Sequence, residues 1–198
     1  MEITRVAVLG HSFATRLDSF LKAEGRRGRQ PFNFGVHSKV EFFAFSGLKL
    51  ASVRQYRGRL QGFRPQVVCV LLGGNDITVN TVPEDFVQYF LSTMSLIARW
   101  VPEAKIVVSP LMPRFYTPDY HYFVPGYNDI VQSVNILLSS SQLPSRNMKL
   151  WFHRFISDRN GEFKDCKAFF SGVGVHLNFE GQNRLAKSLF KACLFCRY

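Results

Sequence analysis

Five short apolar runs alternate with five longer segments of helical periodicity, and this alternation constrains the fold more than any other feature. Each run is continuously apolar, which is typical of strands buried on both faces. Such an alternation predicts an α/β fold, a three-layer α/β/α sandwich around a five-stranded parallel sheet. The predicted strands are residues 5–10, 40–47, 67–74, 105–111 and 148–153, and the predicted helices are 12–25, 48–63, 83–101, 126–142 and 178–195, the last capped by Asn178.

Length and composition indicate one folded domain. The chain has 198 residues, of which 46% are hydrophobic and 20% charged, and it contains no repeat, low-complexity stretch or linker. We therefore expect a single domain over residues 1–198. No apolar run is long enough to cross a bilayer. Met1 stands too close to the first strand for a signal peptide, so we expect an intracellular protein.

The chain is strongly basic, with a formal net charge of +11. This charge either keeps the protein soluble or attracts nucleic acid or another polyanion, and charge alone does not decide between the two. We expect a basic patch on the helical flank, away from the carboxyl ends of the strands. Its residues come from segments 22–30 and 54–64 and are Arg26, Arg27, Arg29, Arg54, Arg57 and Arg59.

The cysteine and histidine spacings do not predict a metal site. Cys69 lies inside an apolar strand, and the pair Cys193 and Cys196 has no second ligand pair nearby. We expect the four cysteines, which include Cys166, to be reduced thiols, and we expect neither zinc nor any other cofactor.

Ser12 directly follows the first strand, in the sequence VLGHSFATRL at residues 8–17. A phosphate-binding loop would need a second glycine and a lysine at fixed spacing after Gly10, and neither is present. The G-x-S-x-G elbow of α/β-hydrolases follows several earlier strands, whereas only one precedes Ser12. A helix cap and a nucleophile remain, and only a nucleophile needs partners elsewhere in the chain.

Residues that could serve as such partners stand at the ends of later strands. Gly47 follows the second strand, Asn75 follows the third in the sequence LLGGNDIT, and His176 precedes the last helix. The carboxyl ends of parallel strands meet at one edge, which is where open α/β sheets bind ligands. We therefore expect Ser12, Gly47, Asn75 and His176 to converge in one shallow pocket.

The blocks LGHS, FSGLKL, GGND and VHLN, in this order, resemble the four sequence blocks of the SGNH (GDSL-like) hydrolases, and the match spans nearly the whole chain. The resemblance implies Ser12 as nucleophile and His176 as base. It implies an oxyanion hole formed by the N–H groups of Ser12 and Gly47 and the side-chain amide of Asn75. The strand order expected with it is 2-1-3-4-5, as in flavodoxin.

Elementary chemistry supports the same roles. A serine hydroxyl becomes a nucleophile when a base lies within hydrogen-bond reach, and His176 can accept that proton and return it to a leaving alcohol. Preorganised donors stabilise the oxyanion, and the loss of one donor costs about 10²–10³ in rate. No metal is required.

The sequence departs from the family pattern at two positions. The family carries Asp three residues before the histidine, and this chain has Val173 there. Asp165, Asp158 or a backbone carbonyl could orient His176 instead. His11 replaces the aspartate of the first block, and we expect it to make a structural hydrogen bond.

Two functions therefore remain open. The first is an esterase that cleaves small ester substrates through an acyl-enzyme at Ser12. The second is a catalytically weak or inactive SGNH-fold binding module. Domains resembling this one occur in proteins of some retroelements, where a charge of +11 would suit association with nucleic acid.

Overall fold

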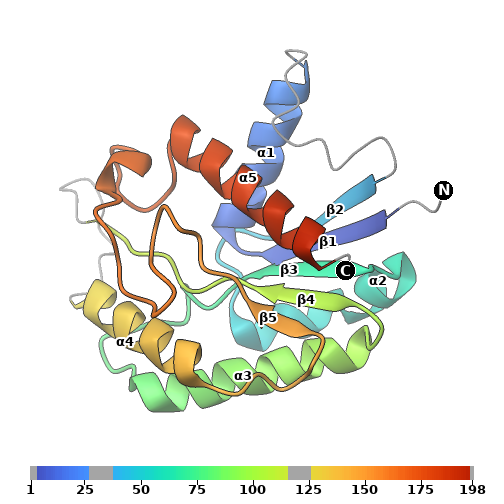
Figure 1. Ribbon diagram of the computed structural model, residues 1–198, viewed down its shortest axis with the longest axis horizontal. Helices are drawn as coiled ribbons and strands as arrows, with labels where there is room; N and C mark the ends of the chain where they lie inside the picture. Colours follow the sequence, from blue (N-terminus) through green and yellow to red (C-terminus); the bar gives the residue numbers. More distant parts are fainter. Residues whose placement is uncertain (1–3, 27–37, 116–125, 197–198) are drawn as a thin grey trace.

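The computed structural model describes residues 4–26, 38–115 and 126–196. Five strands form one parallel sheet in the order β2-β1-β3-β4-β5, which confirms the predicted fold class and strand order (Figure 1). The strands are β1 Thr4–Gly10, β2 Ser38–Ala44, β3 Val67–Leu71, β4 Lys105–Val108 and β5 Met148–Leu150.

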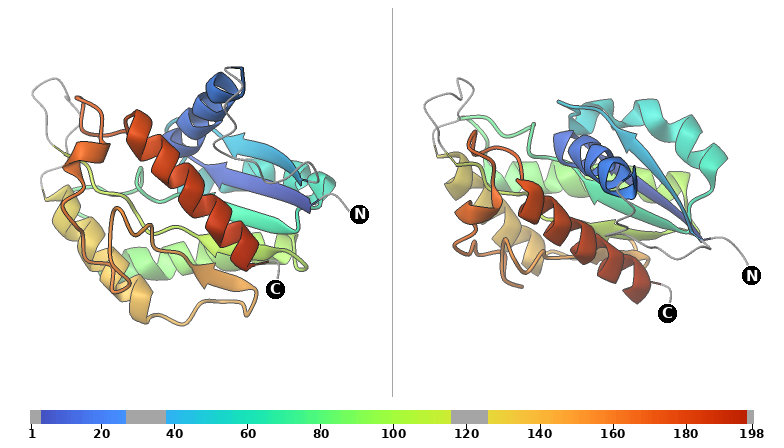
Figure 2. Two further views of the ribbon diagram at one scale, coloured as in Figure 1. Left: turned by 45° about the horizontal axis from the view of Figure 1, so that its top comes forward. Right: turned by 90° about the horizontal axis from the view of Figure 1, so that it is seen from above.

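Helices cover both faces of the sheet (Figure 2). On one face lie α1 (Ser12–Arg26) and α5 (Phe179–Phe195). On the other lie α2 (Arg57–Phe63), α3 (Pro83–Trp100) and α4 (Tyr127–Ser140). Asn178 caps α5 as predicted, because its side chain accepts a hydrogen bond of 3.0 Å from the Gly181 N–H.

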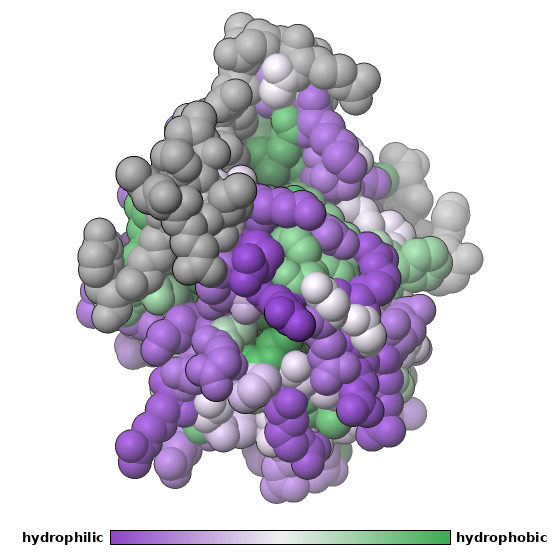
Figure 3. Space-filling model, turned by 90° about the vertical axis from the view of Figure 1, so that its right-hand side faces the viewer, coloured by the Kyte–Doolittle hydropathy of each residue, from purple (hydrophilic) through white to green (hydrophobic). Residues whose placement is uncertain are grey.

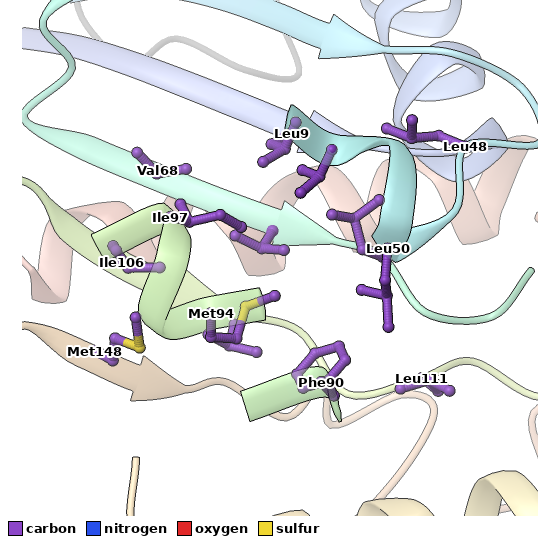
Figure 4. Packing of buried hydrophobic residues seen from close by; sticks show 14 of the residues in the cluster. Leu9, Leu48, Leu50, Val68, Phe90, Met94, Ile97, Ile106, Leu111 and Met148 are labelled. Atoms are coloured by element: carbon purple, nitrogen blue, oxygen red, sulfur yellow. The ribbon is translucent and has the colours of Figure 1, made fainter. Parts of the chain in front are cut away.

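Two hydrophobic cores, one on each face, hold these layers together. Along β1, Val6 and Val8 belong to the core beneath α1 and α5, whereas Ala7 and Leu9 belong to the opposite core. Figure 4 shows part of the second core, where side chains from the sheet meet those of α3 and of the segment that begins at Leu48. The alternation follows from the two-residue period of a strand, and burial on both faces explains why the run is apolar throughout.

One predicted helix, residues 48–63, was wrong as a continuous α-helix. The chain instead forms a 3-10 helix, η1 (Leu50–Tyr56), followed by the short α2. The buried side chains of η1 are Leu50, Val53 and Tyr56, spaced by three residues. That spacing aligns them on one face of a helix with three residues per turn, which favours the 3-10 form.

The second to fifth strands all end earlier than predicted, at Ala44, Leu71, Val108 and Leu150. Gly47 has a φ of +84° and Gly73 a φ of +100°, and an extended strand cannot continue through left-handed backbone. The residues expected at the strand ends therefore lie in loops beyond the carboxyl edge of the sheet. The opposite, amino-terminal edge is mainly hydrophilic, with small hydrophobic areas between the polar side chains (Figure 3).

Among the described residues, no helix is both long and apolar enough to cross a membrane.

Candidate active site

Ser12 is the first residue of α1, two positions after the end of β1. The turn between them is tight, because a Cβ on Gly10 would lie 2.8 Å from both Ala14 Cβ and the Leu71 carbonyl oxygen. The N–H groups of Ala14 and Thr15 both bond to the His11 carbonyl. Within the described part of the chain no hydrogen bond involves the Ser12 hydroxyl, so this side chain does not cap the helix and is available for chemistry.

Gly47 lies in the loop after β2, where it is solvent-exposed and nothing occupies the 4 Å around its Cβ position. Across the described ranges, no hydrogen bond engages its N–H. Asn75, in the loop after β3, donates a hydrogen bond of 3.3 Å from Nδ2 to the carbonyl of Leu48, the neighbour of Gly47. The amide nitrogen of Asn75 thus lies beside the Gly47 loop.

Arg114, in the segment after β4, determines how the Asn75 amide is oriented. Its Nη2 donates to Asn75 Oδ1 at 2.9 Å and to the Gly74 carbonyl at 3.0 Å, and its guanidinium lies 4.5 Å from the centroid of the Tyr127 ring. The sequence reasoning did not identify this residue. Its position just beyond the carboxyl end of a predicted strand is the only sequence feature that could have indicated Arg114 as a site residue.

Asp76, next to Asn75, has a structural role. Its carboxylate accepts the Leu50 N–H at 3.1 and 3.2 Å, which joins the loop after β3 to the start of η1. Burial raises the pKa of Asp76 to about 6, although this hydrogen bond and the nearby Lys49 oppose the shift.

His176 lies in the segment that precedes α5. Its carbonyl accepts the Ser171 N–H at 2.7 Å, and its ring lies edge-on to Phe13, the neighbour of Ser12, with centroids 6.1 Å apart. In the described residues no hydrogen bond joins His176 to the Ser12 hydroxyl. The structure thus brings His176 against Phe13, the residue after Ser12, without a hydrogen bond between the His176 ring and the Ser12 hydroxyl.

The electrostatic surroundings of His176 keep it neutral at pH 7. Burial, together with the positive charges of Arg16 and Arg114, lowers the pKa of His176 to about 4. A neutral imidazole can accept a proton, but the two arginines disfavour the imidazolium that would result. A carboxylate partner would have the opposite effect.

No carboxylate contacts the His176 ring among the residues that the structure describes. Val173 is 41% exposed. Asp158 accepts the N–H groups of Asn160 and Glu162 within its own turn, and Asp165 is an exposed residue beside Cys166.

His11 is buried at the turn between β1 and α1. Its backbone N–H donates to the Leu71 carbonyl at 3.1 Å, whereas its Nδ1 is buried without a partner in the described structure. Burial lowers the pKa of His11 to about 3, with contributions from Arg114 and His176, so the side chain stays neutral. The structural hydrogen bond expected of the His11 side chain is not made by Nδ1, and the main-chain N–H alone bonds across the turn.

Only some residues of the expected basic patch lie within the described part of the chain. Arg54 and Arg57 are exposed, and Arg59 pairs with Glu41 at 3.0 Å. The side chain of Arg26 and the whole of Arg27 and Arg29 lie outside the described residues.

The four cysteines are present as free thiols. Cys69 and Cys193 lie in the buried core with their sulfur atoms 3.4 Å apart. No group of three or more potential metal ligands occurs among the residues described.

Comparison with known proteins places this arrangement in a family. Residues 8–184 match the model of the GDSL-like lipase/acylhydrolase family. No curated protein matches the chain significantly.

Several solved structures share the fold at low sequence identity. A GDSL-like lipase from Bacteroides thetaiotaomicron is 15% identical with a TM-score of 0.67, and the match covers 96% of this chain and 87% of that one. A lipase/acylhydrolase from Enterococcus faecalis is 11% identical with a TM-score of 0.64, over 96% and 95% of the two chains. A carbohydrate esterase family 3 protein from Talaromyces cellulolyticus is 14% identical with a TM-score of 0.63, over 98% and 99%.

Proposed function

The chain belongs to the GDSL-like lipase/acylhydrolase family, and on that premise we propose that it is a serine esterase that cleaves small carboxylic esters. Ser12 is the nucleophile, His176 is the general base, and the N–H groups of Ser12 and Gly47 form the oxyanion hole with the Asn75 amide. No metal takes part in the reaction.

The proposed reaction proceeds in two steps. In the first, Ser12 Oγ attacks the ester carbonyl while His176 takes the hydroxyl proton, and the oxyanion receives hydrogen bonds from the three donors. The tetrahedral intermediate then expels the alcohol, which leaves with the proton from His176, and the acyl group stays on Ser12. In the second step water attacks the acyl-enzyme while His176 takes a proton from it, and the intermediate then releases the acid as His176 returns that proton to Ser12 Oγ.

The orientation of Asn75 supports this proposal most directly. Arg114 occupies the side-chain oxygen of Asn75, so the Nδ2 group must face the Gly47 loop. If the Asn75 side chain only packed against its neighbours, its oxygen and nitrogen would not need to be held in fixed positions. A donor pair built from Gly47 N–H and Asn75 Nδ2 is what a tetrahedral oxyanion requires.

A catalytically weak binding module is the second candidate. The observation in its favour is the environment of His176, which has two arginines nearby and no carboxylate contact within the described residues. Removal of the orienting acid in a serine-protease triad lowers kcat by about 10⁴. We place this candidate second because a serine hydroxyl free of hydrogen bonds in the described structure, a histidine that is neutral at pH 7 and an oriented amide donor support the esterase.

Hydrolysis of p-nitrophenyl esters from acetate to octanoate tests the proposal. Their good leaving group demands little of an imperfect acid–base relay. Ser12→Ala should abolish turnover, and His176→Ala should come close to the same loss because members of a catalytic unit are not additive. Ser19→Ala, an exposed serine on the same helix, is the matched control and should retain full activity. A folded wild-type protein without turnover on any of these esters would favour the binding module.

A further inference from the structure

A groove lies next to the edge strand β5, and Ser12 is not among its lining residues. It is a groove of about 510 Å³ between α5 and the segment 151–155 that follows β5, two regions that also lie side by side in Figure 1. We call it the α5 groove. Its lining residues are Trp151, Phe152, Arg154, Phe155, Arg184, Lys187, Ser188 and Lys191.

The floor of the α5 groove is fixed by hydrogen bonds. Trp151 Nε1 donates to Ser188 Oγ at 3.1 Å, and the same hydroxyl lies 2.9 Å from His153 Nδ1. The other ring nitrogen of His153 is 3.1 Å from Ser109 Oγ, beneath the sheet edge. The indole of Trp151 is thereby held in place on α5.

The walls of the groove are positively charged. Arg184, Lys187 and Lys191 follow one another at helical spacing along α5, and Arg154 faces them from the opposite wall. Arg184 is paired with Glu180 at 2.7 Å. Neither Arg154, Lys187 nor Lys191 forms an ion pair in the part of the chain that is described, and no carboxylate lines the groove there.

Aromatic residues share the lining with these cations. They are Trp151, Phe152 and Phe155, and the Trp151 ring packs against that of Phe195, an exposed residue at the end of α5. Lys149 lies 3.3 Å from the centroid of the Phe195 ring. An unpaired set of cations attracts phosphates, and exposed rings offer surfaces on which unpaired bases can stack.

We infer that the α5 groove binds single-stranded nucleic acid, with Arg154, Lys187 and Lys191 on the phosphates and Trp151 against a base. A duplex would use the cations but not the rings, because its bases are already stacked. An anionic membrane would likewise leave a recessed groove of this volume unfilled. The site is separate from Ser12 and does not depend on the proposed esterase activity.

Fluorescence anisotropy with a labelled 12-nucleotide oligothymidylate tests the inference on the full chain. Binding should weaken as salt rises, with a slope of log K against log salt of about −2, because each phosphate contact on a single strand contributes about −0.7. The same strand annealed to its complement should bind more weakly. Equal affinity for the duplex, or binding to anionic vesicles but not to the oligonucleotide, would overturn the inference.

Pairs of substitutions distinguish binding in the α5 groove from binding that depends only on the net charge of the protein. Lys187→Glu with Lys191→Glu should weaken binding at least tenfold, and the milder Lys187→Gln with Lys191→Gln should weaken it several-fold if the first pair disturbs α5. Arg54→Glu with Arg57→Glu, on the opposite side of the sheet, makes the same change in net charge and should have a much smaller effect. If the two charge-reversed variants lost affinity equally, binding would depend on the net charge of the protein, and the inference that the α5 groove is the binding site would be wrong. Circular dichroism melting checks that each variant is folded.

Discussion

Arg114 holds the side-chain oxygen of Asn75 through a hydrogen bond of 2.9 Å and so directs the amide nitrogen toward the loop of Gly47. The two residues come from loops after different strands, and the bond between them joins those loops at the site. Because Arg114 also lowers the pKa of His176, it influences both the oxyanion hole and the base.

Arg114→Met should lower kcat on a p-nitrophenyl ester by roughly 10- to 100-fold with little change in KM, because the oxyanion donor loses its fixed orientation. The rates are best compared near pH 8, where His176 is neutral in every variant. Asn75→Ala alone should cost about 10²-fold, and adding Arg114→Met to it should cost little more. Fully additive losses would mean that Arg114 does not act through Asn75.

The pH dependence of the esterase should reflect His176. Since its pKa is lowered to about 4, kcat/KM should stay level as pH falls from 7 and should decline only as the imidazole is protonated near pH 4. Arg16→Gln removes a positive charge near the ring, so the pKa of His176 should rise and the decline should begin at higher pH. Arg54→Gln, an exposed arginine on the opposite side of the sheet, should leave the profile unchanged. An identical profile for Arg16→Gln and wild type would contradict this electrostatic account.

Val173→Asp should increase activity, because it places a carboxylate three residues before His176, where the family resemblance implies the missing acid. A carboxylate at the ring would stabilise the imidazolium formed in the transition state, and kcat should rise, on the order of tenfold or more. Val173→Asn is the isosteric control and should give a much smaller gain. If the aspartate variant is folded and no faster, the acid position inferred from the resemblance is incorrect for this chain.

Gly174→Ala should destabilise the loop that carries His176. Gly174 has a φ of +68°, and a Cβ there would clash with the Phe115 carbonyl oxygen. We expect a loss of about 1–3 kcal/mol in the free energy of unfolding together with a fall in esterase activity. Gly172→Ala is the matched control, because nothing lies within 4 Å of its Cβ position. Urea titrations of the two variants give the comparison, and similar stabilities would exclude the steric explanation.

His153 should make the protein less stable in acid. Burial lowers the pKa of His153 from 6.5 to about 4, so the unfolded chain binds a proton that the folded chain does not between these values. Stability should therefore be fully present above pH 6.5 and should fall as pH drops toward 4, by on the order of 3 kcal/mol from this residue. His153→Gln cannot titrate and should flatten the curve of unfolding free energy against pH. An unchanged slope would show that other groups, such as His11, account for the loss.

Much of the fold could be predicted from the sequence, because strand and helix patterns are local. The continuous apolar runs around Val8 and Cys69 identify strands buried on both faces, and parallel strands necessarily end at the same edge. The second helical segment was wrongly predicted as one α-helix. Its apolar residues Leu50, Val53 and Tyr56 repeat every three residues, which is close to the 3.6-residue period of an α-helix.

The sequence by itself determined the layers and the edge at which Ser12, Gly47, Asn75 and His176 were expected, since these follow from periodicity and from the order of blocks along the chain. The strand order was expected from the family resemblance, and the structure confirms it. Only the tertiary structure decided that Arg114 orients Asn75, that Asp158 is committed to its own turn, and that two arginines lower the pKa of His176. The physical reason is that hydrogen bonds and electrostatic shifts depend on ångström distances between segments far apart in the chain, and side-chain burial sets their strength. Local patterns carry no information about those distances.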